Sequence, residues 1–299
     1  MGTWPLSGPF RVGTRALGRG KRHPGGEAVL AALESGLNFF DTADIYGGGV
    51  AEETVGRTML GTRRTPLICT KVGNRIVGNE VRQDFSPGWL LVAVAASLSR
   101  LQIETIDVLL LHSPPADFDW KNFDRAPLER LREQGRIRCY GVSCRSVVAA
   151  ERVIDAGVGS VLEIVYNLAD RRAGELFPRA SAAGYDIICR MPLAYGLLRG
   201  AQPEDFGVDD HRSQLSEPEK QWIYGAAERL SFLEEYPGGR VASALRFAFT
   251  DPAISVAVVG MHKKDHVDAA VRAAELGPLS EIDVRRIEQA VPTTFPGWN

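Results

Sequence analysis

Short apolar runs alternate along the chain with longer segments in which apolar residues recur every three or four positions, from about residue 24 onward. The runs predict strands, because near-continuous apolar character is typical of parallel strands covered on both faces. These strands are expected at 37–41, 67–71, 106–112, 138–142, 162–165, 186–190 and 254–259. The periodic segments predict helices at 26–35, 51–60, 87–101, 122–134, 146–156, 174–183, 217–249, 264–274 and 280–291.

This alternation predicts an α/β fold with a parallel sheet and crossover helices. The seven strands make a (β/α)8 TIM barrel if the segment at residues 1–4 supplies a short or truncated first strand. An open doubly wound sheet is the alternative, but its Gly-x-Gly-x-x-Gly fingerprint is absent, and Gly47-Gly48-Gly49 has the wrong spacing. We therefore expect one barrel domain over residues 1–299, with an extra helix at its C-terminus.

The composition of the chain indicates which binding partners and which cellular location to expect. The 35 basic and 37 acidic side chains nearly cancel, so nothing favours nucleic acid as a partner. The four cysteines lack CxxC spacing and are interpreted as reduced core thiols. No apolar stretch approaches the roughly 20 residues that cross a bilayer, and MGTWPLSGPF does not resemble a signal peptide. We expect a cytoplasmic protein that does not enter the membrane.

Candidate catalytic groups lie where predicted strands end, which is where barrel enzymes place them. Three consecutive strands end at Asp41, Lys71 and His112, and Tyr46 follows the first of them. Taken singly, Asp41 could be a loop-capping carboxylate, Tyr46 a loop aromatic and His112 a strand-end histidine. Their joint appearance at one rim favours a site for proton transfer.

The chemistry of these four side chains is complementary. A buried lysine requires a counter-ion, and Asp41 on the neighbouring strand is the candidate for Lys71. A phenol has a pKa of about 10 in water, and a nearby ammonium eases its release of a proton to a developing alkoxide. Tyr46 is thus the candidate general acid, and His112 can donate a second hydrogen bond to the same oxygen.

The segments GLNFFDTADIYGGGVAEETVG, LICTKVG and DVLLLHSPP resemble the signature segments of the aldo-keto reductase superfamily. The resemblance runs from GTW at residues 2–4 to the last predicted helix, and RMPLAYGLLRG resembles bacterial members with R-x-P-L-x-x-G-x-L after the seventh strand. It implies Asp41, Tyr46, Lys71 and His112 as a catalytic tetrad that works with a nicotinamide cofactor. The implied cofactor contacts are Thr3, Trp4, Asp41, Ser143, Cys144, Glu163, Arg190, Pro192, Leu193, Gly196, Leu198, Gly260, His262, Lys263 and His266.

Several positions depart from the family pattern. Cys144 and Glu163 stand where the family usually has Asn and Gln on the nicotinamide carboxamide, and Ala269 and Ala270 replace a polar pair near adenine. The family's first strand also begins before GTW, so either the true start lies upstream or the barrel closes with a stub.

A basic cluster follows the last predicted strand. His262, Lys263, Lys264 and His266 gather at a helix N-terminus, which suits the 2′-phosphate of NADP(H). A solvated basic helix start is the alternative. A zinc site on His262 and His266 is disfavoured because no third ligand accompanies them, and we expect no metal.

The expected function is NADPH-dependent reduction of an aldehyde or ketone, or the reverse oxidation of an alcohol, with NADH left open as a cofactor. Its partner is a small carbonyl or alcohol, and the oligomeric state stays open. The substrate is expected against Trp4, Tyr46, His112, Trp120 and Trp298. The departures at Cys144, Glu163, Ala269 and Ala270 motivate an alternative, in which the barrel binds nicotinamide for regulation or redox-neutral chemistry.

Overall fold

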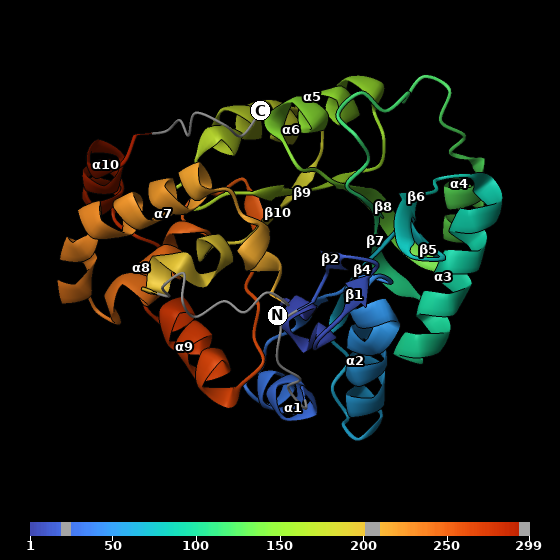
Figure 1. Cartoon of the computed structure of the whole chain (residues 1–299), viewed down its shortest axis with the longest axis horizontal. Coiled ribbons are helices and arrows are strands. Elements are labelled where there is room, and N and C mark those ends of the chain that lie inside the picture. The colour runs from blue at the N-terminus through green and yellow to red at the C-terminus, as the bar shows by residue number, and fades with distance from the viewer. Residues whose placement is uncertain (19–24, 201–209, 293–299) are drawn as a thin grey trace.

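A computed structural model describes residues 1–18, 25–200 and 210–292. Within these residues, seven parallel strands form one sheet in the order β11-β10-β9-β8-β7-β4-β3, around which the helices are arranged (Figure 1). The strands are β3 (Phe39–Asp41), β4 (Leu67–Val72), β7 (Ile106–His112), β8 (Ile137–Ser143), β9 (Val161–Val165), β10 (Asp186–Arg190) and β11 (Ile254–Val258). All seven predicted strands are confirmed, and no bound differs from its prediction by more than two residues.

The first three residues close the sheet into a barrel. Gly2 forms parallel bridges with Asp41 at the end of β3 and with Gly260 just beyond β11. Its amide donates to the carbonyl oxygen of Val259 at 2.7 Å, and the amide of Thr3 donates to the carbonyl oxygen of Asp41 at 2.9 Å. The predicted truncated first strand is thus a one-residue bridge, and backbone groups on both edge strands find partners through it. The expected (β/α)8 barrel with a truncated first strand is confirmed.

The barrel interior and its outer shell are separate apolar clusters. The interior receives one buried side chain from each of five strands, namely Cys69, Leu110, Val161, Ile188 and Val258. The outer shell is made where helices cover the strands, as TIM barrels require. The first helices are α1 (Gly26–Glu34), α2 (Val50–Leu60), α3 (Pro87–Leu101), α4 (Ala126–Glu133) and α5 (Val147–Ala156). The later ones are α6 (Phe177–Ala182), α7 (Glu217–Arg229), α8 (Gly239–Phe247), α9 (Lys264–Glu275) and α10 (Glu281–Ala290). None of these described helices has the length and apolar character needed to cross a membrane.

Three helix predictions need correction. The single helix predicted at 217–249 is α7, a short 3₁₀ helix (Ser231–Glu235) and α8, because Gly238 and Gly239 adopt φ values of 80° and 69° that no α-helix continues. The helix predicted from 122 begins at Ala126. The helix predicted at 174–183 is a 3₁₀ helix (Arg172–Leu176) followed by α6.

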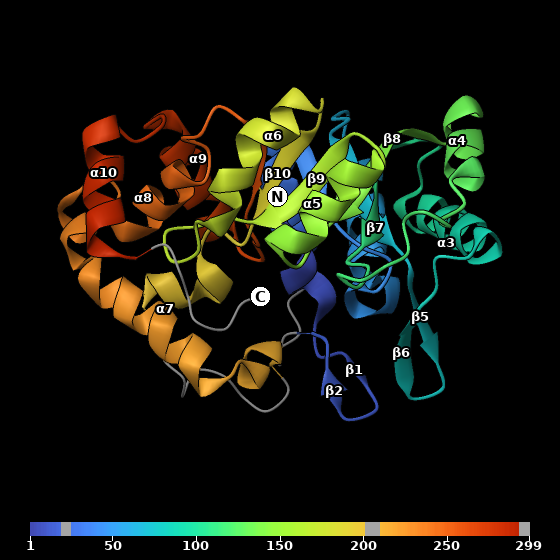
Figure 2. The ribbon, with the colours of Figure 1, turned by 90° about the horizontal axis from the view of Figure 1, so that it is seen from above.

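Two antiparallel hairpins were not predicted. They are β1 (Arg11–Val12) with β2 (Arg15–Ala16), and β5 (Asn74–Val77) with β6 (Glu80–Gln83). Figure 2 shows both hairpins projecting on the same side of the barrel. Because β5 begins two residues after β4 ends, this side carries the carboxyl ends of the barrel strands, where barrel enzymes hold their active sites.

Candidate active site

Neighbouring strand ends bring the four predicted catalytic side chains together. Asp41 is the last residue of β3, Lys71 lies one residue before the end of β4, and His112 ends β7. Tyr46 lies in the loop after β3, directly before Gly47, whose φ of 64° favours glycine. The rings of Tyr46 and His112 meet edge to face, with centroids 5.8 Å apart. The side chains predicted from separate strands therefore share one site.

Lys71 is buried between two carboxylates. Its ammonium donates to the carboxylate of Asp41, as predicted, and to the carbonyl oxygen of Thr42 at 3.0 Å. A second carboxylate, Glu163 on β9, places Oε1 at 3.4 Å from the same nitrogen, and both side chains are 1% exposed. The sequence did not indicate this contact. Two buried carboxylates thus share one buried cation.

The two charges of the Asp41–Lys71 pair respond differently to burial. Burial raises the pKa of the Asp41 carboxyl to about 6, against the opposing effect of the Lys71 ammonium. Burial also disfavours the charge on Lys71, but Asp41 and Glu163 outweigh it and hold the pKa of this lysine well above its usual range. Lys71 is therefore a permanent cation at physiological pH.

Tyr46 and His112 are both neutral at physiological pH. Burial raises the pKa of Tyr46, and the Lys71 ammonium, 5.3 Å from the ring centroid, acts in the opposite direction. Burial, followed by Lys71, Arg145 and Arg190, lowers the pKa of His112 well below its usual range. The site therefore offers a protonated phenol beside a neutral imidazole, which are hydrogen-bond donors rather than charges.

A cavity of about 460 Å³ opens over these groups. Its wall holds catalytic candidates together with residues expected to bind cofactor. The predicted residues that line it are Trp4, Asp41, Tyr46, His112, Glu163, Arg190, Pro192, Leu193, Gly196, Gly260 and His266.

The segment after β10 lines this cavity with unusual backbone. Met191, Ala194 and Tyr195 have φ values of 61°, 43° and 60°, a region that residues with a side chain rarely adopt. The Asn167 side-chain amide donates to the carbonyl oxygen of Met191 at 3.1 Å and helps to hold it. Clusters of this kind persist where surrounding structure enforces them, commonly at ligand clamps.

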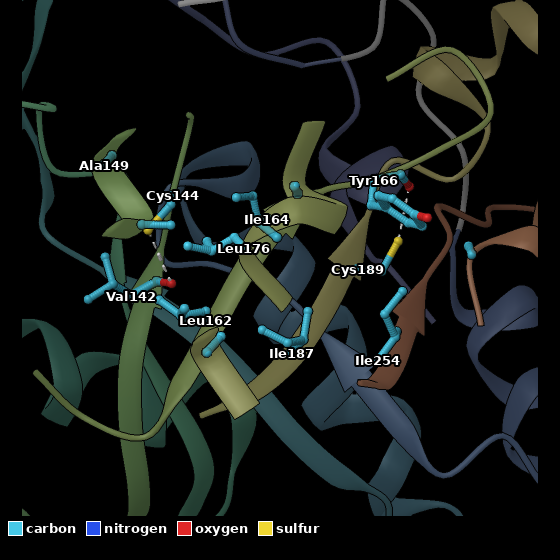
Figure 3. Packing of buried hydrophobic residues seen from close by; sticks show 14 of the residues in the cluster. Val142, Cys144, Ala149, Leu162, Ile164, Tyr166, Leu176, Ile187, Cys189 and Ile254 are labelled. Atoms are coloured by element: carbon cyan, nitrogen blue, oxygen red, sulfur yellow. Dashed lines mark hydrogen bonds between the residues drawn. The ribbon is translucent and has the colours of Figure 1, made fainter. Parts of the chain in front are cut away.

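Other predicted cofactor residues lie behind the cavity wall. The Thr3 hydroxyl donates to the backbone of Asp41 at 2.9 Å, and Ser143 and Leu198 are buried. The Cys144 thiol packs in the apolar cluster between barrel and helices, 3.9 Å from the carbonyl oxygen of Val142 (Figure 3). Its predicted contact with the carboxamide is thus not provided by this geometry, because the thiol belongs to the core.

Trp120, a member of the predicted substrate set, is not among the described residues that line the cavity. Trp120 is buried, and its ring packs edge to face on Phe118 and Phe123 at centroid distances of 4.6 and 5.6 Å. The Trp120 side chain belongs to this aromatic cluster, so the structure does not provide its predicted contact with the substrate. Trp298 lies outside the described residues.

The basic residues of the cluster after β11 do not all face the cavity. His266 lines the cavity and its ring meets that of His262 at 4.6 Å, whereas Lys263 is exposed. Lys264 pairs with Asp268 at 2.7 Å along α9. Within the described ranges, no group of three or more His, Cys, Asp and Glu side chains could hold a metal ion.

Several residues of the wall were not predicted from the sequence. They include Arg15, Ser113, Arg145, Met191, Tyr195, Arg199 and Arg212. Arg145 follows the end of β8 by two residues, so the strand-end rule could have found it. Arg15 lies in an unpredicted hairpin, and no signal pointed to it.

Comparisons with known proteins support the family resemblance seen in the sequence. The sequence model of the aldo/keto reductase family matches residues 10–292. The chain is 30% identical over 281 residues to the uncharacterised oxidoreductase YqkF of Bacillus subtilis, covering 86% of this chain and 84% of the relative.

Two solved structures share the fold over nearly the whole chain. An aldo-keto reductase from Bacillus halodurans in its holo form is 26% identical with a TM-score of 0.80, covering 99% of this chain and 93% of that one. The glycerol dehydrogenase of Gluconobacter oxydans is 27% identical with a TM-score of 0.79, covering 97% and 90%. The family match, the relative and the shared fold lead to one conclusion: this chain belongs to the aldo/keto reductase family.

Proposed function

We propose that the protein is an NADP(H)-dependent oxidoreductase that reduces an aldehyde or ketone to an alcohol, or catalyses the reverse reaction. The observation that carries this proposal is the Tyr46 phenol beside His112 in the wall of one cavity, with the buried Lys71 ammonium 5.3 Å from the centroid of the phenol ring. A similar solved structure bears the name glycerol dehydrogenase, which is consistent with alcohol and carbonyl chemistry.

The cavity fits a nicotinamide group. Glu163 Oε2 and Arg190 Nε are buried without a hydrogen-bond partner among the described residues, so one can accept from a carboxamide NH₂ and the other can donate to its oxygen. Pro192 and Leu193 add apolar surface to the same wall. When bound, the cofactor supplies the hydride that reduces the carbonyl carbon.

The protein's side chains then supply the proton that the reduction requires. Tyr46 donates its phenolic proton to the carbonyl oxygen as negative charge develops there, and His112 can donate a hydrogen bond to the same atom. Lys71 stabilises the phenolate that remains, because an ammonium favours the charged form of a nearby acid. In the reverse direction the Tyr46 phenolate accepts the proton of the alcohol.

The preference for NADP(H) is proposed from the basic residues of the wall. His266 lies in the first turn of α9, where backbone amides also favour an anion, and Arg199 lines the same cavity. We expect His266→Ala to weaken the binding of NADPH by roughly fivefold, which corresponds to about 1 kcal/mol for one lost phosphate contact. The affinity for NADH should change little. Lys263→Ala is the matched control, because Lys263 is exposed away from the wall. Fluorescence titration of both cofactors measures the effect, and equal losses for NADPH and NADH would place the phosphate elsewhere.

Glu163 is expected to tune the acidity of Tyr46. Burial and then the charges of Asp41 and Glu163 raise the pKa of Tyr46, against Lys71. Removing one negative charge in Glu163→Gln therefore lowers that pKa, so the alkaline rise of alcohol oxidation moves to lower pH. The binding of NADP⁺ should also weaken relative to that of NADPH, because the positive nicotinamide ring loses a nearby negative charge.

Rates of alcohol oxidation from pH 6 to 10 and calorimetric affinities test this expectation. Glu129→Gln is the control, since its carboxylate binds the Tyr140 hydroxyl at 2.6 Å away from the cavity. A pH profile and an affinity ratio that both match the wild type would show that Glu163 does not act on the site.

The proposed function is tested directly by following NADPH oxidation with a panel of aldehydes and ketones. Turnover of at least one carbonyl compound is the expected result. Tight NADPH binding without turnover across the panel would instead favour the alternative role in regulation or redox-neutral chemistry.

A further inference from the structure

Two arginines in the cavity wall have no partner among the residues that the structure describes. Arg15 lies in β2, and Arg145 follows the end of β8 by two residues. Within the described ranges, neither guanidinium forms an ion pair or a hydrogen bond with another residue. Each group carries five donors and a fixed positive charge, so each is available to a ligand in the cavity.

Four other charged groups of the wall are engaged with protein partners. Arg212 pairs with Asp210 at 2.7 Å, and Arg190 donates to the carbonyl oxygen of Cys144 at 3.2 Å. The carboxylates of Asp41 and Glu163 both face Lys71. The free charge at this cavity is therefore positive.

The backbone that carries Arg15 is fixed at the rim. The Gln214 side chain donates to the carbonyl oxygen of Ala16 at 2.8 Å. At the tip of the β1–β2 hairpin, a Cβ on Gly13 would lie 2.5 Å from the carbonyl oxygen of Asn79, so the two hairpin turns pack against each other. The β1–β2 and β5–β6 hairpins lie side by side in Figure 2. Arg15 is thus presented by a supported hairpin rather than by an isolated loop.

Arg145 interacts electrostatically both with Arg15 and with the catalytic candidate His112. Burial and then the positive charges of Arg15 and Arg190 lower the pKa of Arg145, and Arg145 in turn contributes to the lowered pKa of His112. Like charges that repel one another in a partly enclosed cavity are stabilised when an anion enters.

We propose that Arg15 and Arg145 bind an anionic group of the substrate, so that the preferred substrates are small carbonyl compounds that carry a carboxylate or a phosphate. Planar guanidinium groups bind both anions with paired hydrogen bonds. The inference rests on the proposed carbonyl reductase function. It assigns the anion to the substrate, because Arg145 acts on His112, where the carbonyl oxygen is expected, and because His266 and Arg199 of the same wall are the residues proposed for cofactor phosphate.

Matched substrates test the assignment. The pairs are 4-formylbenzoate with its methyl ester, and glyceraldehyde 3-phosphate with glyceraldehyde. The wild type should prefer the anionic member of at least one pair, and high salt should reduce that preference. Arg15→Met with Arg145→Met should lower kcat/KM for that anionic member roughly 10- to 100-fold, the usual range for hydrogen bonds to a charged group, and change the neutral member little. Arg11→Met is the control, because Arg11 shares the hairpin and does not line the cavity.

Two binding measurements keep the test independent of turnover. Calorimetry with 4-(hydroxymethyl)benzoate and with inorganic phosphate should show weaker binding of at least one anion by the double variant than by wild type or Arg11→Met. Titration with NADPH should give equal affinities for all three proteins. A large loss of NADPH affinity in the double variant would assign the pair to cofactor phosphate and overturn the proposal, as would unchanged anion binding. If no aldehyde is reduced but an arginine-dependent anion still binds, the anion site stands and the carbonyl reductase function fails.

Discussion

Tyr46→Phe is expected to lower carbonyl reduction by roughly 100- to 10,000-fold, the usual contribution of a positioned general acid. Phenylalanine keeps the ring that meets His112 edge to face but has no proton to donate. NADPH affinity and thermal stability should remain close to those of the wild type, because the substitution removes only one hydroxyl at the cavity wall. Single-turnover rates of NADPH oxidation give the measurement.

Tyr140→Phe is the matched control. It removes a hydroxyl that donates to Glu129 at 2.6 Å, outside the cavity, so it should cost some stability and leave turnover unchanged. Retention of more than a third of the wild-type rate by Tyr46→Phe would remove Tyr46 from the proposed mechanism.

Lys71→Met is expected to damage both stability and activity. Methionine fills a similar volume but leaves the carboxylates of Asp41 and Glu163 buried without their shared cation. Removing one partner of a buried ion pair typically costs about 3–5 kcal/mol, so a large fall in the free energy of unfolding is expected. Carbonyl reduction should also fall by orders of magnitude, because Tyr46 loses the cation that stabilises its phenolate.

A second variant separates the two effects. Lys71→Met combined with Glu163→Gln removes one of the stranded charges, so it should recover part of the lost stability without recovering activity. Urea unfolding and turnover per folded molecule give the two quantities. If Lys71→Met retained turnover within threefold of the wild type at neutral pH, Lys71 would have no role in the proton transfer.

The barrel strands could be predicted because each is a continuous apolar run whose limits are set locally. The break between α7 and α8 was also visible, since Pro237, Gly238 and Gly239 interrupt the predicted helix, and the apolar period was wrongly carried through them. The β1–β2 hairpin offers no such signal. Its strands have two residues each, and contacts with Asn79 and Gln214, distant in sequence, support it.

In the candidate site, too, some features could be predicted from the sequence and others could not. Asp41, Lys71 and His112 lie at or one residue from strand ends, so topology alone brings them together. The contact between Glu163 and Lys71 depends on which face of β9 points inward, and that follows from the register of β9 against β8 and β10. Cys144 directly follows the end of β8 and its thiol packs in the core, although its sequence position suggested a contact with the cofactor.

The most direct test of the central claim is hydride transfer itself, measured with NADPH that carries deuterium at C4 of the nicotinamide. The protein is incubated with this cofactor and the panel of aldehydes, including 4-formylbenzoate and its methyl ester, and the alcohols are analysed by mass spectrometry. The account predicts deuterium on the carbinol carbon of at least one product, formed by the wild type and by Tyr140→Phe and lost in Tyr46→Phe. Bound NADPH that keeps its label in the presence of every aldehyde would contradict it.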